Sequence, residues 1–308
     1  MTVEATPTTP QPKTGDLRSL IRDHTVTQRR QLVAVRTVGR RRIPEILIGP
    51  FRKGAPGVAI HCCYHKIGTV WFGSILTRIA RNWGVGFIDL RTSDAAVVAP
   101  TFALDGGSNR TDRLTGPFRG THMIRDPRDV VISGYHYHLW TKEEWAHQPM
   151  QETRGFDDIL ELMPSFADNS YQELLNALPK EEGLRMELLF SSRITTSPMA
   201  AWDYQQPSFL EVTYEDVFAD EATWFQRIFD HYGLRPAAAH EAMNIVEERT
   251  FSKVSKARSS GDAAEGQHLR SGRPQQWREE FTPALKELFR EKHGLDLIRL
   301  GYERTLEW

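Results

Sequence analysis

The stretch VAIHCCYHKIGTVW, residues 58–71, joins an apolar strand-like run to a short polar turn and to the start of a helix-like run. Its turn carries Lys66, Gly68 and Thr69. A lysine, a glycine and a threonine at such a turn suit a phosphate group at a helix N-terminus, where free backbone N–H groups and the helix dipole favour an anion. The stretch therefore predicts a strand–loop–helix unit that binds a phosphate.

A second stretch of the same design, GTHMIRDPRDVVIS, covers residues 120–133. It again runs from an apolar strand to a polar turn and a helix, with Pro127 at the first helical turn, where its missing N–H needs no partner. Arg125 and Ser133 stand eight positions apart in it. Two phosphate-type turns about sixty residues apart predict a ligand that carries phosphates at two separate places.

The order of residues in the first turn separates two classes of nucleotide site. The loop that binds ATP or GTP reads G-x-x-x-x-G-K-[ST], whereas here Lys66 precedes Gly68 and Cys63 stands five positions before that glycine. The order K-x-G-T-x-W instead resembles the 5′-phosphosulfate loop of sulfotransferases that use 3′-phosphoadenosine 5′-phosphosulfate (PAPS). The pair Arg125 and Ser133 resembles the 3′-phosphate site of that family.

Three further segments resemble the same family in the same order, so that the resemblance covers roughly residues 57–302. They are Tyr214-Glu-Asp, the pair Thr250-Phe251, and Arg270-Ser-Gly followed by Trp277. The resemblance implies a P-loop-like sulfotransferase fold. It also implies that the nucleotide contacts Lys66, Gly68, Thr69, Val70, Trp71, Arg125, Ser133, Tyr214, Phe251, Arg270, Ser271 and Gly272.

Within that set, the resemblance gives separate roles to the two ends of the nucleotide. Lys66 is expected to contact the bridging oxygen and the 5′-phosphate, with the backbone N–H groups of Gly68 and Thr69. Arg125 and Arg270 offer forked donors that suit the 3′-phosphate. The aromatic side chains of Trp71, Tyr214 and Phe251 are expected near the adenine.

The chain also departs from the family pattern. Val70 replaces a threonine, Ser271 replaces a lysine, and no K-x-H stands upstream of the 3′ site, where cytosolic members carry a catalytic histidine. A carboxylate base in this region would be an aspartate, because no glutamate occurs between positions 45 and 143. We place Asp105 first, just past an expected strand at 97–102, while Asp89 and Asp94 stay open.

The histidines of the chain are weaker candidates for the base. We interpret His65 and His122 as packing or loop residues, and we regard His136 and His138 as candidates to line the acceptor pocket. Arg128 is interpreted as a solvent-facing or aspartate-paired arginine and is left outside the site.

Strand-like runs alternate with helix-like runs from about residue 57, which predicts one α/β domain with a mostly parallel sheet flanked by helices. We expect a disordered tail at 1–20 and the domain at 21–308. The last helix is expected to run from Pro283 to His293 and to close at Gly294.

Composition limits the partners. A net charge of −1 gives no overall field for nucleic acid, so an anion site must be local. The only cysteines, Cys62 and Cys63, are adjacent in one strand-like run, which disfavours a bridge between them. The sequence has no run of about 18 apolar residues. We therefore expect a cytoplasmic enzyme, and we leave homodimer formation open.

The sequence thus predicts a sulfotransferase that moves the sulfuryl group of PAPS to a hydroxyl, less readily to an amine, and releases 3′-phosphoadenosine 5′-phosphate (PAP) without a metal. The acceptor is expected to be a small molecule or a carbohydrate. Two alternatives stay open: a P-loop-like kinase or nucleotide hydrolase, and an inactive nucleotide-binding protein of the same fold.

Overall fold

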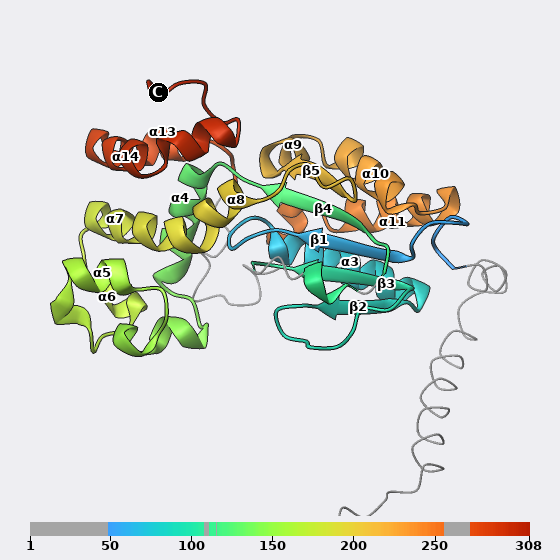
Figure 1. Ribbon diagram of the computed structural model, residues 1–308, viewed down its shortest axis with the longest axis horizontal. Helices are drawn as coiled ribbons and strands as arrows, with labels where there is room; N and C mark the ends of the chain where they lie inside the picture. The colour runs from blue at the N-terminus through green and yellow to red at the C-terminus, as the bar shows by residue number, and fades with distance from the viewer. Residues whose placement is uncertain (1–48, 108–110, 115, 256–271) are drawn as a thin grey trace, which may run out of the picture. The chain divides into compact units, whose positions relative to one another are not determined.

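The computed structural model describes residues 49–107, 111–114, 116–255 and 272–308 (Figure 1). Residues 50–308 form one compact unit. The predicted tail at 1–20 lies outside the described residues, as do Arg270 and Ser271. Within the described ranges, every helix is too short or too polar to cross a lipid bilayer.

A five-stranded sheet forms the centre of this unit, in the order β2-β3-β1-β4-β5. All four pairings are parallel, which confirms the predicted α/β class. The strands are β1 (Val58–Cys62), β2 (Gly86–Asp89), β3 (Thr101–Asp105), β4 (Arg119–Ile124) and β5 (Phe209–Thr213). The expected strand at 97–102 is therefore misplaced: β3 begins at Thr101, and Asp105 is its last residue.

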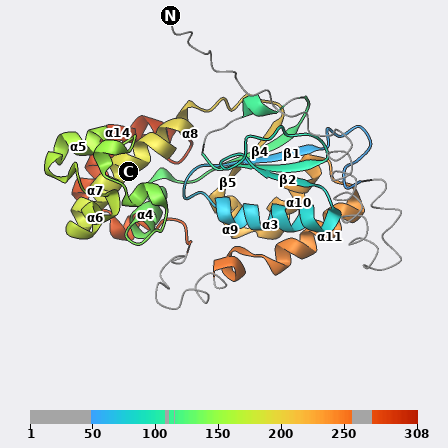
Figure 2. The same ribbon diagram turned by 90° about the horizontal axis from the view of Figure 1, so that it is seen from below.

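Four helices lie along one face of the sheet (Figure 2). They are α3 (Thr69–Trp83), α9 (Tyr214–Ala219), α10 (Glu221–Tyr232) and α11 (Pro236–Glu248). Helix α3 forms where apolar residues recur at three and four positions, and it buries Phe72, Ile75 and Ile79 on that face. It ends at Gly84, whose left-handed backbone lets its N–H reach the carbonyl of Ala80.

The opposite face of the sheet is also covered. Alternate residues of β1 point to the two sides, so that Ala59 packs with the α3 cluster while Val58, Ile60 and Cys62 pack in a second cluster. Trp202, from the connection between α8 and β5, belongs to that second cluster. Both cysteines are buried and free, as predicted.

A second group of helices gathers beyond the ends of β1 and β4 (Figure 1). It comprises α4 (Pro127–His138), α5 (Asp157–Leu162), α6 (Tyr171–Ala177), α7 (Lys180–Ser191), α8 (Ser197–Ala201), α13 (Trp277–Glu280) and α14 (Pro283–Arg299). Short helical segments lie between them, namely η2 (Glu144–His147), η3 (Met150–Glu152), η4 (Pro164–Phe166) and the π-helical η5 (Ser192–Thr196), whereas η1 (Thr111–Arg113) lies between β3 and β4. These helices share an aromatic core that includes Phe156, Tyr171 and Phe190.

The predicted end of the last helix is wrong. Helix α14 does not close at Gly294 but continues to Arg299. Gly294 is buried in the helix interior, and a Cβ there would lie 2.6 Å from Cδ2 of Leu306. The glycine therefore makes room for the C-terminal segment to pack against the helix and does not end it.

Candidate active site

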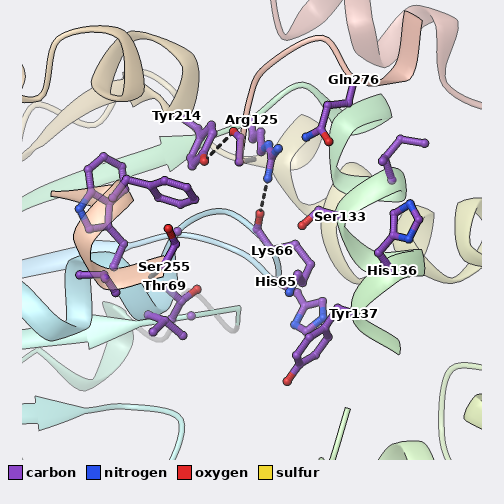
Figure 3. Close-up of a pocket in the computed structure, with 18 of the residues that line it drawn as sticks. His65, Lys66, Thr69, Arg125, Ser133, His136, Tyr137, Tyr214, Ser255 and Gln276 are labelled. Atoms are coloured by element: carbon purple, nitrogen blue, oxygen red, sulfur yellow. Dashed lines mark hydrogen bonds between the residues drawn. The ribbon is translucent and has the colours of Figure 1, made fainter. Parts of the chain in front are cut away.

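The strands β1, β3, β4 and β5 end at one edge of the sheet, and a cavity opens there (Figure 3). The chain leaves β1 toward β2 and β3 on one side and returns to β4 and β5 on the other. Ligands of open α/β sheets bind at such a switch point. The cavity, of about 220 Å³, is several times the volume of a water molecule. It therefore has room for part of an organic ligand.

Most of the predicted nucleotide residues line this cavity, although they come from distant parts of the chain. The lining includes Lys66, Gly68, Thr69, Val70, Trp71, Arg125, Ser133, Tyr214, Phe251 and Gly272. The sheet brings them together because each lies in a turn or helix that follows a strand, or in the segments packed over those turns.

The turn after β1 has a backbone that few residues tolerate. Lys66 has φ 64° and Gly68 has φ 81°, both in the left-handed region. A Cβ on Gly68 would lie 3.0 Å from Cε of Met123, so that the position needs glycine for space as well as for conformation. Helix α3 begins directly afterwards, with no side chain capping its first N–H groups. The turn thus presents backbone donors at the cavity.

Two side chains of this turn are fixed by contacts, one with the end of the preceding strand segment and one with helix α4. The Thr69 hydroxyl donates to the carbonyl of Tyr64 at 3.3 Å and lies 3.2 Å from Sγ of Cys63. Lys66 Nζ lies 3.6 Å from the ring centre of Tyr137 on α4, in a cation–π contact. Val70 is 47% exposed.

Arg125 follows β4 and is 3% exposed. Its Nη1 donates to the carbonyl oxygen of Lys66 at 3.1 Å, so that it links the two predicted phosphate turns (Figure 3). Its guanidinium lies 4.3 Å over the ring of Tyr214. Nε and Nη2 are buried without a hydrogen-bond partner among the described residues. A buried cation with two unused donors is costly unless an anion binds to it.

An aromatic wall stands beside Arg125. Tyr214 donates its hydroxyl to the carbonyl of Gly272 at 2.9 Å, and burial raises the pKa of Tyr214 to about 12. Phe251 and Trp71 meet edge to face at 5.5 Å. A Cβ on Gly272 would lie 2.2 Å from the Phe251 ring, so only glycine fits there. Trp71 is 2% exposed and donates Nε1–H to the carbonyl of Arg249, so it offers the cavity little of its ring.

Helix α4 brings Ser133 to the cavity wall and keeps Arg128 away from it. Asp126 caps the helix by accepting from the backbone N–H of Arg128. The buried Arg128 side chain makes a forked pair with Asp126, at 2.9 and 2.8 Å, and donates to Glu303 at 2.6 Å. Arg128 is thus the aspartate-paired arginine that the sequence suggested.

Asp105 is not part of the cavity lining. Its side chain is fully buried at the end of β3, where Oδ1 accepts the backbone N–H of Gly107 at 3.3 Å. Its neighbour Gly106 lines the cavity instead. Of the two other aspartates, Asp89 forms a forked pair with Arg91 at 3.0 and 2.6 Å, and neither Asp89 nor Asp94 lines the cavity.

The cavity is also lined by residues outside the predicted nucleotide set, among them His65, Arg91, His136, Tyr137, Glu143 and Gln276. The interpretation of His65 as a packing or loop residue is incomplete, because His65 lines the cavity and contacts His138 at 3.0 Å. His136 lines the cavity as expected, whereas His138 is fully buried behind it. No local pattern links positions 65 and 138, and only the fold brings them together.

The charge of the cavity is local, as the composition required. Among the described lining residues, Lys66, Arg91 and Arg125 are cationic, and Glu143 is the single carboxylate. Glu143 accepts hydrogen bonds from the hydroxyl of Tyr137 and from Nε1 of Trp145. The cavity therefore attracts an anion although the whole chain is close to neutral.

Comparison with known proteins gives one family and several solved structures. The family model "Sulfotransferase domain" matches residues 119–294. Mouse sulfotransferase SULT7A1 complexed with PAP is 16% identical over 78% of this chain and 84% of that chain, with a TM-score of 0.44.

Two structures of retinol dehydratase are also similar, each at 15% identity over 79% of this chain and with a TM-score of 0.45. One is a complex with androsterone and the inactive cofactor PAP, covered to 81%, and the other a complex with retinol and PAP, covered to 82%. The search of curated proteins gives no match.

Proposed function

The chain belongs to the sulfotransferase domain family, because the family model covers residues 119–294 and thus more than half of it. On this premise we propose that the protein transfers a sulfuryl group from PAPS to a hydroxyl acceptor and releases PAP. Both expected phosphate turns line one cavity, and the cavity carries a local positive charge. These are the properties that a nucleotide with separate 5′ and 3′ phosphate groups requires.

Arg125 is the observation that carries the proposal. Its Nε and Nη2 are buried and find no partner in the part of the chain that the structure describes, and Ser133 lines the same cavity. A guanidinium edge with two unused N–H groups matches a phosphate bidentately. We assign the 3′-phosphate of PAPS to this edge, in agreement with the spacing of Arg125 and Ser133 in the sequence.

The turn after β1 would hold the other end of the nucleotide. Sulfuryl transfer resembles phosphoryl transfer, with in-line attack and charge that builds on the leaving oxygen. We assign the stabilisation of that charge to the α3 N-terminus and Lys66; Lys66, Gly68 and Thr69 line the cavity, and no side chain caps the helix. The aromatic wall of Tyr214 and Phe251 would contact the adenine.

Calorimetric titration with PAP, AMP and ATP plus Mg²⁺ tests the proposal. We expect PAP to bind much more tightly than AMP, because only PAP carries the 3′-phosphate. Arg125→Ala should weaken PAP binding by about 10- to 100-fold, the value of a charged hydrogen-bonded contact, and leave AMP binding nearly unchanged. Arg227→Ala, at an exposed arginine of α10, is the matched control.

Equal affinities for PAP and AMP, together with tight binding of ATP–Mg²⁺, would overturn the proposal and favour the kinase-like alternative. Binding of PAP without any turnover of PAPS would favour the inactive alternative. The hydroxyl acceptor, the independence from metal and the cytoplasmic location stay predictions from the sequence. A screen with PAPS and a panel of phenols, alcohols and monosaccharides, with and without EDTA, tests the first two.

A further inference from the structure

Three polar side chains in hydrogen-bond contact lead from the cavity into the aromatic core that the helices α4 to α7 share. His65 Nε2 lies 3.0 Å from His138 Nε2, and His138 Nδ1 lies 2.7 Å from Oε2 of Glu187. His138 and Glu187 are both fully buried. The cavity residue His65 is therefore connected, through a second histidine, to a carboxylate that the solvent does not reach.

The hydrogen-bond roles along this chain follow from its far end. The Glu187 carboxyl group accepts from the hydroxyls of Tyr171, at 2.8 Å, and Ser191, at 2.7 Å. A carboxylate only accepts, so His138 must donate Nδ1–H to it. Neutral His138 then has a lone pair on Nε2, which accepts from Nε2–H of His65. The same logic leaves the lone pair of neutral His65 on Nδ1.

We propose that His65 is the general base that removes the proton from the acceptor hydroxyl, and that His138 and Glu187 are positioning residues that fix its tautomer. The inference rests on the proposed sulfuryl transfer and names a base that lines the cavity, which Asp89, Asp94 and Asp105 do not. His65 is the neighbour of Lys66 in the chain, so the base and the residue assigned to the leaving oxygen share one turn.

The packing around His65, His138 and Glu187 fixes their relative positions. The rings of His65 and His138 are parallel within 4° at 5.1 Å. Gly134 on α4 faces Glu187 so closely that a Cβ there would lie 2.1 Å from Oε1. Helix α4 therefore carries a glycine at the one point where the buried carboxylate needs its space. A fixed partner of this kind sets the tautomer of a catalytic histidine.

The groups that face His65 keep it neutral. They are Lys66, Arg91 and His138, with the ring of Tyr137 at 5.7 Å. Burial, together with these three neighbours, lowers the pKa of His65 well below 6.5. At neutral pH the ring is thus in the form that accepts a proton. Of the other candidates in the cavity, His136 contacts Glu280 at 3.3 Å, and Glu143 already accepts from Tyr137 and Trp145.

The step balances as follows. The acceptor oxygen forms a bond to sulfur while the bond from sulfur to the 5′-phosphate oxygen breaks, and the electron pair of that bond stays on the phosphate oxygen of PAP. The hydroxyl proton moves to Nδ1 of His65. The imidazolium keeps its hydrogen bond to His138, whose own Nδ1–H points at the negative charge of Glu187. Loss of the proton to solvent after product release restores neutral His65.

The kinetic test uses the full chain with PAPS and unsubstituted phenol as the probe acceptor, whose hydroxyl stays protonated at neutral pH, and it also follows PAPS hydrolysis by water. We expect His65→Ala to lower turnover by about 10²- to 10⁴-fold, the usual value of a general base, with PAP affinity changed by less than about tenfold. Wild-type kcat/KM should fall only below pH 6.5, and His65→Ala should lack this acid limb. His138→Gln replaces the proposed positioning partner of His65 and should therefore shift the midpoint of this acid limb. His240→Ala, at an exposed histidine of α11, is the control.

A second measurement does not depend on activity. In protein labelled with ¹⁵N-histidine, the His65 signals are those lost in His65→Ala. We expect its Nε2 to carry the proton and its Nδ1 to be unprotonated at pH 7. A proton on Nδ1 would overturn the inference, as would full PAPS turnover by His65→Ala. Failure of wild-type protein to bind PAP would instead overturn the proposed function, so the two failures are distinct.

Discussion

The two walls of the cavity are built in different ways. The wall formed by the turns after β1 and β4 consists of backbone groups and side chains close to strand ends, and Arg125 links its two turns through the carbonyl of Lys66. The wall around His65 depends on side chains from α4, α6 and α7 that meet in the helical core. The first wall is suited to holding fixed negative charge, and the second is suited to moving a proton. Substitutions should therefore affect binding and turnover separately.

Of the three substitutions that compare the two walls, Lys66→Ala should have the largest effect. Removal of the cation proposed to stabilise the leaving oxygen should lower kcat by about 10³-fold, similar to the loss of one oxyanion donor. PAP affinity should fall much less, because Arg125 and the backbone of the turn remain. Single-turnover kinetics with PAPS, beside PAP titration, separate the two effects. A loss confined to PAP affinity would contradict the assigned role.

Gly134→Ala should disturb the wall around His65 and leave the wall that binds the nucleotide unchanged. The new Cβ would collide with Oε1 of Glu187, and overpacking of this kind costs about 1 to 3 kcal/mol of unfolding free energy. Turnover should fall with it, while PAP affinity stays near that of the wild type. Thermal unfolding and calorimetry measure both. Glu187→Asp, which shortens the carboxylate, should recover stability in the double variant, and failure to do so would argue against this clash.

The smallest expected effect is a gain. Val70→Thr places a hydroxyl at the exposed first turn of α3, where the resemblance expects a threonine. One added hydrogen bond to the 5′-phosphate should tighten PAP binding by about 0.5 to 1.5 kcal/mol. Calorimetry with PAP measures the gain, and Val98→Thr, at another exposed valine, is the control. Equal gains in both variants would show that the hydroxyl does not reach a phosphate.

The sequence predicts that the turns after β1 and β4 line one cavity, and it can do so because the information is local. Lys66, Gly68 and Thr69 are adjacent in the chain, and the spacing from Arg125 to Ser133 is fixed by one turn and one helix. A parallel sheet then brings strand ends to one edge, so the α/β prediction also brings the turns together. The family match covers residues 119–294, which include the second of the two turns but not the first.

The same reasoning fails where contacts are distant. His65, His138 and Glu187 come from a turn and from two helices, and neither spacing nor periodicity connects them. Asp105 was placed first because of its position relative to a strand, but the strand extends to Asp105 and buries its side chain. Gly294 resembled a helix stop, yet its lack of a side chain serves packing against Leu306. In each of these cases the outcome depends on contacts between residues that are distant in the chain.

The left-handed backbone of Lys66 has a consequence for how the protein can change. A non-glycine residue with φ 64° carries conformational strain of about 1 to 3 kcal/mol. Glycine at this position would relax the turn, but it would also remove the amine from the cavity. Selection for thermal stability and selection for catalysis therefore oppose each other at position 66. A library sorted for thermostability alone should enrich glycine there and lose turnover, as expected of a residue whose strain serves function.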